Sequence, residues 1–184
     1  KVLLVARRLN KLKKAAKSIY KQGGEVDYIA ADVSKISTPK KVLAKCLKKW
    51  GNLHILVNNT GGPPVGNLMK HNEKTWANAI QNNLFSVVRF TKLAIPIMKK
   101  NNWGRVITIT STIVKEPSPK MILSATSRGG ISAFTKAIAI DFAKYNISAN
   151  VISPGGIMTN RFVNLVKLSA KKENKKFTRK LFEI

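Results

Sequence analysis

The sequence is poor in cysteine, in acidic residues and in long apolar runs. Its single cysteine, Cys46, excludes an internal disulfide and predicts a reduced, partly buried thiol on a helix. Every apolar run is shorter than the roughly 20 residues that a membrane-spanning helix needs. Residues 1–20 alternate lysine with apolar residues, which is not the pattern of a signal peptide. These absences predict a cytoplasmic protein that does not span a membrane.

Acidic residues are scarce relative to basic ones. The chain has 34 lysine and arginine residues against 8 aspartate and glutamate residues, a formal net charge of +26. Such a charge favours phosphate-bearing ligands and suggests a basic interaction module that binds nucleic acid. However, lysine outnumbers arginine and the cations are scattered, whereas readout of bases favours clustered arginine and interleaved aromatic residues. Specific nucleic-acid binding is therefore the less favoured hypothesis.

What the sequence does contain is a regular alternation of short apolar runs with helical periods. This pattern is typical of βαβ units and predicts an α/β protein with a parallel sheet. A length of 184 residues, 44% of them hydrophobic, suits one domain over 1–184. The predicted strands are 2–6, 26–31, 53–57, 106–110 and 149–152, and the predicted helices are 10–22, 39–50, 73–99 and 124–145. Residues 162–184 are basic and amphipathic.

Distinctive residues follow each predicted strand. In an open parallel sheet, ligands bind beyond the carboxyl ends of the strands, so these residues are expected to meet at one rim. In chain order they are Arg7 and Arg8, then Asp32 and Val33, then Asn58, Asn59, Thr60 and Gly61, then Ser111, and finally Pro154 and Gly155.

The order and spacing of these residues carry a family resemblance. Ala-Arg-Arg at 6–8, Ala-Asp-Val at 31–33 and the run from His54 to Gly61 are followed by Gly104-Arg105-Val106 before Ser111, and by 150–155 before Thr159. From about residue 2 to residue 161, the chain resembles the short-chain dehydrogenase/reductase family. The resemblance implies a three-layer, doubly wound parallel sheet of the Rossmann type. It also implies hydride transfer between a nicotinamide cofactor and a carbonyl or alcohol.

The resemblance assigns cofactor contacts to the rim. Arg7 and Arg8 match a basic pair that meets the adenosine 2′-phosphate, which favours NADP(H) over NAD(H); two solvated arginines remain the structural alternative. Contacts to the rest of the cofactor are implied for Asp32 and Val33 at the adenine, for Asn58, Thr60 and Gly61 at the ribose turn, and for Pro154, Gly155 and Thr159 at the nicotinamide side. A purely structural role for Asn58 stays open.

Three catalytic positions follow from the same resemblance. Ser111 matches a serine that polarises the substrate carbonyl, and Asn83 matches an asparagine that holds a water in a proton relay. The third, a Tyr-x-x-x-Lys motif, is occupied by Ser124 and Arg128. A serine hydroxyl is a far weaker acid than a phenol, and a guanidinium does not readily lose its proton. Arg128 is instead expected to bind the cofactor ribose or a carboxylate substrate. The proton donor would be Ser111, water or the substrate, and the sequence does not choose among them.

The motifs at 59–63 and 123–128 resemble those of a divergent branch close to the 3-oxoacyl-acyl-carrier-protein reductases. That branch implies a small-molecule or acyl-carrier-linked carbonyl substrate. Family members assemble through their two long helices, so a homo-oligomer through helices 73–99 and 124–145 is expected. The replaced Tyr and Lys positions favour an alternative, a non-catalytic dinucleotide-binding protein or an inactive fragment.

The family also begins with a strand and a glycine-rich turn that binds the pyrophosphate, and these 184 residues contain neither. In the doubly wound order, that strand lies between the strands at 2–6 and 53–57. We therefore expect two half-sheets with facing, unpaired edges, which are costly to bury or to expose. The last strand of the family sheet is also expected to be missing from this chain. The sequence thus predicts a fragment, truncated at both ends, that folds poorly and binds cofactor weakly by itself.

Overall fold

Strands and helices alternate along the chain in a computed structural model that describes residues 1–172. The amino-terminal half contains β1 (Val2–Ala6), α1 (Leu9–Lys21), β2 (Val26–Ala30), α2 (Thr38–Trp50) and β3 (Ile55–Asn58). The rest of the described chain contains α3 (Glu73–Ile80), α4 (Ser86–Lys100), β4 (Gly104–Ile109), α5 (Ile122–Phe142), β5 (Ile147–Ile152) and α6 (Asn160–Lys172). The predicted α/β class is confirmed, and the predicted elements differ from these mostly by one to three residues at their ends.

Turn and cap residues explain where several helices begin and end. Gly51 follows α2 at φ +72°, and its N–H donates to the Leu47 carbonyl at 2.8 Å. This left-handed conformation costs a glycine little, so the chain can leave the helix and enter β3. At the start of α3, the Asn72 side chain accepts a hydrogen bond from the Thr75 N–H at 3.0 Å.

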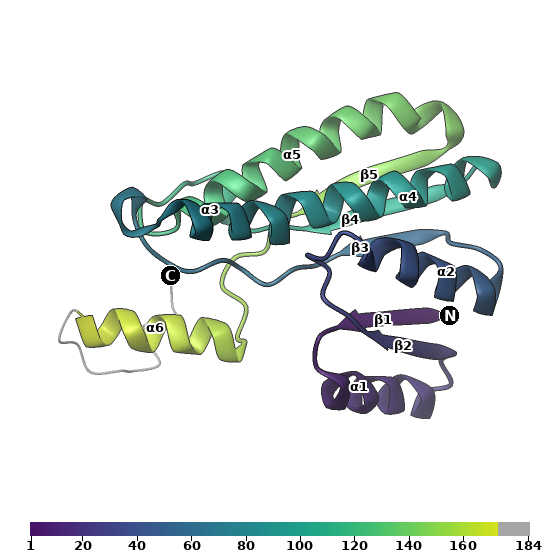
Figure 1. The fold of residues 1–184 in the computed structure, drawn as a ribbon, viewed down its shortest axis with the longest axis horizontal. Helices are drawn as coiled ribbons and strands as arrows, with labels where there is room; N and C mark the ends of the chain where they lie inside the picture. The colour runs from purple at the N-terminus through teal and green to yellow at the C-terminus, as the bar shows by residue number, and fades with distance from the viewer. Residues whose placement is uncertain (173–184) are drawn as a thin grey trace.

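The strands form two separate parallel sheets, β1–β2 and β3–β4–β5 (Figure 1). Val2 of β1 pairs in register with Val26 of β2, and Ile55 of β3 pairs with Arg105 of β4. Among the residues described, no hydrogen-bonded ladder joins β1 to β3. The prediction of two half-sheets is therefore confirmed.

A cavity of about 680 Å³ lies between the two sheets and is lined by both β1 and β3. The Val2 N–H donates to the Glu25 carbonyl, so the alternate residues Leu3 and Val5 direct their backbone groups away from β2. In the same way, the bond from the Arg105 N–H to the His54 carbonyl places the backbone groups of 55 and 57 on the free edge of β3. We call this space, which also reaches Cys46 and Trp50, the seam cavity.

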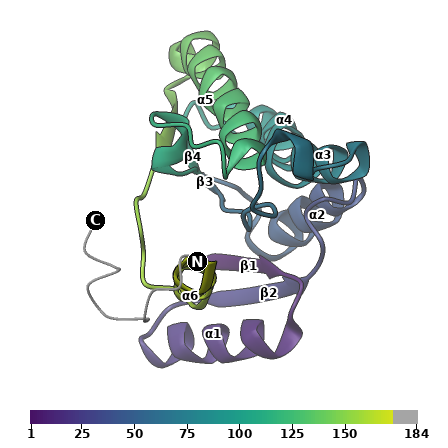
Figure 2. The ribbon, with the colours of Figure 1, turned by 90° about the vertical axis from the view of Figure 1, so that its left-hand side faces the viewer.

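Helices cover the sheets in layers. The helix α1 packs on β1 and β2, while α4 and α5 pack on the sheet that contains β4 and β5 (Figures 1 and 2). The core of the three-stranded half lies between α4 and its sheet, and consists of Ala94, Ile95, Met98, Val106, Ile147 and Ala149. No helix among residues 1–172 combines the length and the apolar character needed to cross a bilayer.

A second apolar cluster joins the two sheets across one side of the seam cavity. Val42 and Leu43 of α2 and Phe90 of α4 form its buried centre. Leu3, Val5, Ile29 and Leu56 pack against it, so β1, β2 and β3 all contribute to the same cluster. Helix α2 is thus the element that holds the two-stranded half against the rest of the molecule.

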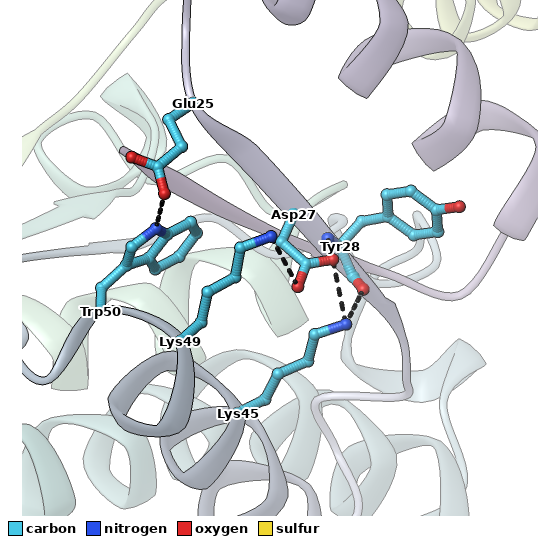
Figure 3. A network of polar contacts seen from close by, with 6 residues as sticks. All are labelled: Glu25, Asp27, Tyr28, Lys45, Lys49 and Trp50. Carbon is cyan, nitrogen blue, oxygen red and sulfur yellow. Dashed lines mark hydrogen bonds and ion pairs between the residues drawn. The ribbon is translucent and has the colours of Figure 1, made fainter.

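A polar network also ties β2 to α2 (Figure 3). The Asp27 carboxylate pairs with the Lys45 ammonium at 3.0 Å and with the Lys49 ammonium at 3.4 Å. Lys45 also donates to the Tyr28 carbonyl at 2.7 Å, and the Trp50 indole donates to the Glu25 carboxylate. Partial burial acts to raise the pKa of Asp27, but the hydrogen bonds from Lys45 and Tyr28 and the two lysine charges outweigh it and lower the pKa.

Two predicted elements are corrected by the structure. The single helix expected at 73–99 is divided by a π-helical turn at Gln81–Phe85, between α3 and α4. The helix expected at 124–145 begins two residues earlier, at Ile122, and ends at Phe142 before a 3-10 turn. Part of the predicted basic segment at 162–184 belongs to α6, while residues 173–184 lie outside the described residues, as does the predicted absence of a last strand.

Candidate functional site

A second cavity, of about 610 Å³, lies at the carboxyl ends of β1, β2 and β3. We call it the rim cavity. The predicted site residues that it brings together are Arg7, Arg8, Asp32, Val33, Thr60, Gly61 and Asn83. They come from four separate segments of the chain, so the expectation that strand ends meet at one rim is supported for the first three strands.

Three cations line one side of the rim cavity. Arg7 and Arg8 occupy the turn between β1 and α1, and Lys11 follows within the first turn of the helix. Lys11 was not predicted, although its position three residues after Arg8 places both on the same side of a helical turn. The positive end of the helix dipole adds to this charge. This side of the cavity therefore suits an anion.

Asp32 provides a fixed negative charge on the neighbouring wall. One of its carboxylate oxygens accepts from the Ser34 N–H at 3.0 Å and from the Ser34 hydroxyl at 2.7 Å. These two hydrogen bonds lower the pKa of Asp32, and the charges of Arg7 and Lys35 lower it further. The Asp32 carbonyl also accepts from the Thr38 hydroxyl at 2.7 Å, which anchors the turn to α2. Asp32 is thus held ionised in one orientation.

The π-helical turn places Asn83 at the inner wall of the rim cavity. Asn83 is fully buried, and its amide donates to the Ala79 carbonyl at 3.0 Å. Its side-chain oxygen accepts from the Thr60 hydroxyl at 3.0 Å. A π-helical turn inserts one residue into an α-helix and is frequent at functional sites. Asn83 was predicted from the family resemblance, whereas this change of helix geometry was not predicted.

Ser111 lies where β4 ends, beside the loop that follows β5. Its hydroxyl accepts from the Ile113 N–H at 3.5 Å, and the neighbouring Thr112 N–H donates to the Pro154 carbonyl at 3.1 Å. A Cβ added to Gly155 would lie 4.0 Å from the Thr112 side chain. Pro154 and Gly155 are therefore next to the segment that carries Ser111. Thr159 lies at the start of α6, where its hydroxyl accepts from the Phe162 N–H at 3.3 Å.

Ser124 and Arg128 are buried in α5, with exposed fractions of 4% and 6%. The Arg128 guanidinium donates from Nη1 to the carbonyls of Ile109 and Thr110, each at 3.0 Å. Its Nη2 donates to the Thr60 carbonyl at 3.3 Å. Arg128 thus contacts the backbone at the ends of β3 and β4.

Asn58 is a predicted site residue that does not line the rim cavity. It lines the seam cavity instead of the rim cavity, and its amide donates to the Thr108 hydroxyl of β4 at 3.4 Å. This contact across two paired strands agrees with the structural alternative for Asn58. Another polar contact, between the hydroxyls of Thr110 and Ser153 at 2.9 Å, joins the ends of β4 and β5 and was not predicted.

Known proteins with similar sequences identify the family of this chain. The family model described as short chain dehydrogenase matches residues 1–169. The chain belongs to the short-chain dehydrogenase family. Among curated relatives, D-beta-hydroxybutyrate dehydrogenase of Cupriavidus necator is 34% identical over 152 residues, which are 83% of this chain and 59% of the relative. The 3-oxoacyl-[acyl-carrier-protein] reductase FabG of Chlamydia pneumoniae is 36% identical over 138 residues, 75% of this chain and 56% of that protein.

Solved structures of short-chain dehydrogenases have the same fold. Actinorhodin polyketide ketoreductase with NADPH superposes with a TM-score of 0.90 at 25% identity, covering 95% of this chain and 68% of that one. NAD⁺-bound xylitol dehydrogenase gives a TM-score of 0.86 at 26% identity, covering 92% and 66%. The chain spans about three fifths of the length of the first curated relatives.

Proposed function

We propose that this protein transfers a hydride between a pyridine nucleotide, with NADP(H) preferred over NAD(H), and a carbonyl or alcohol substrate. The observation that carries the proposal is the rim cavity, where Arg7, Arg8 and Lys11 stand beside the fixed carboxylate of Asp32. Guanidinium groups match the geometry of a phosphate monoester, which distinguishes NADP from NAD. The relatives and solved structures named above include proteins with NADPH and with NAD⁺.

The proposed cofactor contacts divide between two groups of residues. Asp32 and Val33 would hold the adenine, and Thr60 and Gly61 would border the ribose. Pro154, Gly155 and Thr159 would face the nicotinamide side, which when bound supplies or accepts the hydride. The residues at the rim cavity fit the adenosine phosphate by charge.

Proton chemistry would then fall to the hydroxyl of Ser111 and to the surroundings of Asn83. Ser111 would donate a hydrogen bond to the substrate oxygen as negative charge develops on it. Asn83, fixed through its contacts with Ala79 and Thr60, would hold a water through its second amide N–H. Ser124 occupies the position of the family tyrosine, and its hydroxyl is too weak an acid to serve as the usual donor.

A second function is favoured by a specific observation. Ser124 and Arg128 replace the usual acid and cation, and the Arg128 guanidinium is engaged by three backbone carbonyls. A protein that binds the dinucleotide without turnover accounts for this arrangement.

One set of measurements separates the two functions. We expect NADPH to bind more tightly than NADH, measured by nicotinamide fluorescence, and to be oxidised in the presence of a panel of ketones and 3-oxoacyl thioesters. Ser111→Ala should abolish oxidation while leaving NADPH binding unchanged, and Ser148→Ala on β5, at the opposite edge of the sheet, serves as the matched control. Binding without oxidation of any substrate would establish the second function, and equal affinity for the two nucleotides would refute the NADP preference.

We propose a small or acyl-carrier-linked carbonyl substrate and a cytoplasmic location. We also propose a homo-oligomer through the helices at 73–99 and 124–145, where Leu93 and Ile140 are exposed apolar side chains. Sedimentation of the protein and of Ile140→Lys tests the assembly, because a charge at a buried helix contact should separate the subunits.

A further inference from the structure

The Arg128 guanidinium lies at the point where the ladder between β3 and β4 ends. The last paired residues are Asn58 and Thr108. Beyond them, the carbonyls of Ile109 and Thr110 on one strand and of Thr60 on the other all accept hydrogen bonds from Arg128. Where backbone hydrogen bonds no longer join β3 to β4, the Arg128 side chain from α5 connects the two strand ends by its own hydrogen bonds.

This arrangement uses a property that lysine lacks. A guanidinium presents several N–H donors in one plane, so that it can bridge acceptors on two strands at once. An ammonium is a compact charge that donates in three tetrahedral directions. Buried carbonyls that lose such a donor are left without a partner, which is costly in a site with little water.

Two of the bridged segments carry the groups proposed for the chemistry. Thr110 immediately precedes Ser111, and the Thr60 hydroxyl donates to the fully buried side chain of Asn83. Arg128, Thr60 and Asn83 thus form a chain of hydrogen bonds from α5 through the loop after β3 to the π-helical turn. Thr60 takes part through both its backbone carbonyl and its side chain.

We propose that Arg128 is a positioning residue, which fixes the backbone beside Ser111 and, through Thr60, the orientation of Asn83. Its role is to hold these two groups in a constant relation, and it acts without contacting the substrate or the cofactor. This inference rests on the proposed function for its catalytic meaning, while the clamp itself concerns the folded protein alone.

Hydrogen–deuterium exchange of the full protein without cofactor tests the clamp directly. In Arg128→Lys, amides in the segments 59–62 and 108–113 should exchange about tenfold faster or more, because charge-assisted hydrogen bonds to the backbone are lost. Arg105→Lys is the matched control, since Arg105 also donates to two backbone carbonyls, of Gly104 at 2.7 Å and Asn146 at 2.9 Å, at the opposite edge of the same sheet. It should leave both segments unchanged. Unchanged exchange in Arg128→Lys would overturn the proposal.

Thr60→Val provides a milder variant if Arg128→Lys fails to fold. It removes the hydroxyl donor to Asn83 and keeps the backbone carbonyl that Arg128 binds. Exchange should then increase in residues 79–85 while 108–113 stays protected. Equal exchange in 79–85 before and after the substitution would also contradict the proposed chain.

Kinetics then distinguishes positioning from a direct ligand role. A positioning role predicts that Arg128→Lys lowers kcat about as much as Arg128→Met, with the NADPH dissociation constant changed less than about threefold. Thr60→Val should lower kcat without adding to the effect of Arg128→Lys, because the two act in one chain. If Arg128→Lys keeps the kcat that Arg128→Met loses, or if both substitutions of Arg128 greatly weaken NADPH binding, Arg128 is a ligand of the cofactor instead. Absence of turnover in the unsubstituted protein would refute the proposed function, while the exchange results still decide on the clamp.

Discussion

The sheets β1–β2 and β3–β4–β5 differ in what holds them to their helices. The three-stranded half has its own apolar core, in which Ala94 and Met98 of α4 are completely buried against Val106 of β4. The two-stranded half packs on α1 and is joined to the rest of the molecule by α2, through the cluster around Val42 and Leu43 and through the ion pairs of Asp27. The larger half is therefore stabilised by its own buried core, while the smaller half is held to it mainly by α2 and by Phe90 of α4.

The same division separates the two parts of the proposed function. The two-stranded half supplies Arg7, Arg8 and Asp32, whose charges would recognise the cofactor. The three-stranded half and the helices on it supply Ser111, Asn83 and the Arg128 clamp. Recognition by charge needs little more than a surface, whereas chemistry requires groups held to fractions of an ångström, so the better-packed half carries the second task.

The largest expected effect comes from the core of the three-stranded half. Met98→Ala should destabilise the protein by about 2 to 5 kcal/mol, because a completely buried side chain leaves a cavity. Chemical denaturation measures this loss. Met69→Ala is the matched control, since that side chain is 89% exposed and its removal should change the stability little. Equal effects of the two substitutions would contradict the assignment of the core.

The next effect concerns recognition in the two-stranded half. Replacing both Arg7 and Arg8 by alanine should weaken NADPH binding about 100-fold and change NADH binding little, because the charge-assisted hydrogen bonds to the 2′-phosphate are lost. Titration with each nucleotide measures the difference. Replacing Lys13 and Lys14, which are exposed on α1 outside the rim cavity, removes the same charge and should affect neither nucleotide. A similar loss of NADPH affinity in both double variants would show that the effect comes from net charge and not from the position of Arg7 and Arg8.

A smaller effect is expected where β2 meets α2. The pKa of Asp27 is below its ordinary value of 3.8 in the folded protein, so its ion pairs stabilise the fold above the unfolded pKa and this contribution is lost as the pH falls through the folded pKa. Asp27→Asn should lower the stability by about 0.5 to 1 kcal/mol at neutral pH and remove this acid dependence below about pH 4. Trp50 fluorescence reports on the contact between α2 and β2, because the Trp50 indole at the end of α2 donates to Glu25, which directly precedes β2.

A matched control for that experiment is the exposed carboxylate on α5. Asp141→Asn should leave both the stability and the acid dependence unchanged. Glu25→Gln separates the Trp50 contact from the Asp27 pairs, since the pKa of Glu25 is also lowered, first by the Trp50 hydrogen bond. If Asp27→Asn keeps the full acid transition, the ion pairs do not hold β2 to α2.

The smallest perturbation uses the cysteine beside the seam cavity. Cys46 is buried in α2, and burial raises the pKa of its thiol, so reaction with a disulfide reagent at pH 8 should be at least 100-fold slower than in the denatured protein. The rate then reports how often the two halves separate. In a Cys46→Ser background, Ala44→Cys places a thiol on an exposed position of the same helix and should react at the rate of a free thiol. Fast reaction of Cys46 would show that the seam is open.

Much of this architecture could be predicted from the sequence. The alternation of apolar runs with helical periods identified each strand found within residues 1–172, and the doubly wound order implied by the family resemblance predicted the division into two sheets. The residues after the first three strands predicted three segments of the rim cavity, because parallel strands bring their carboxyl ends to one edge, whereas Ser111, Pro154 and Gly155 do not line it. The π-helical turn at 81–85 was missed, since its residues have ordinary helical character and periodicity does not register one inserted residue.

Arg128 shows most clearly what the sequence alone determined and what the tertiary structure decided. The spacing from Ser111 identified Ser124 and Arg128 as replacements for the family's tyrosine and lysine, because such spacing is a property of the linear sequence. The sequence left the guanidinium as a ligand for ribose or carboxylate. Its three acceptors, the carbonyls of Ile109, Thr110 and Thr60, belong to strand ends that are distant in sequence. A hydrogen bond to a backbone carbonyl depends on where that carbonyl lies and not on which residue carries it, so only the folded chain places the guanidinium between the two strand ends.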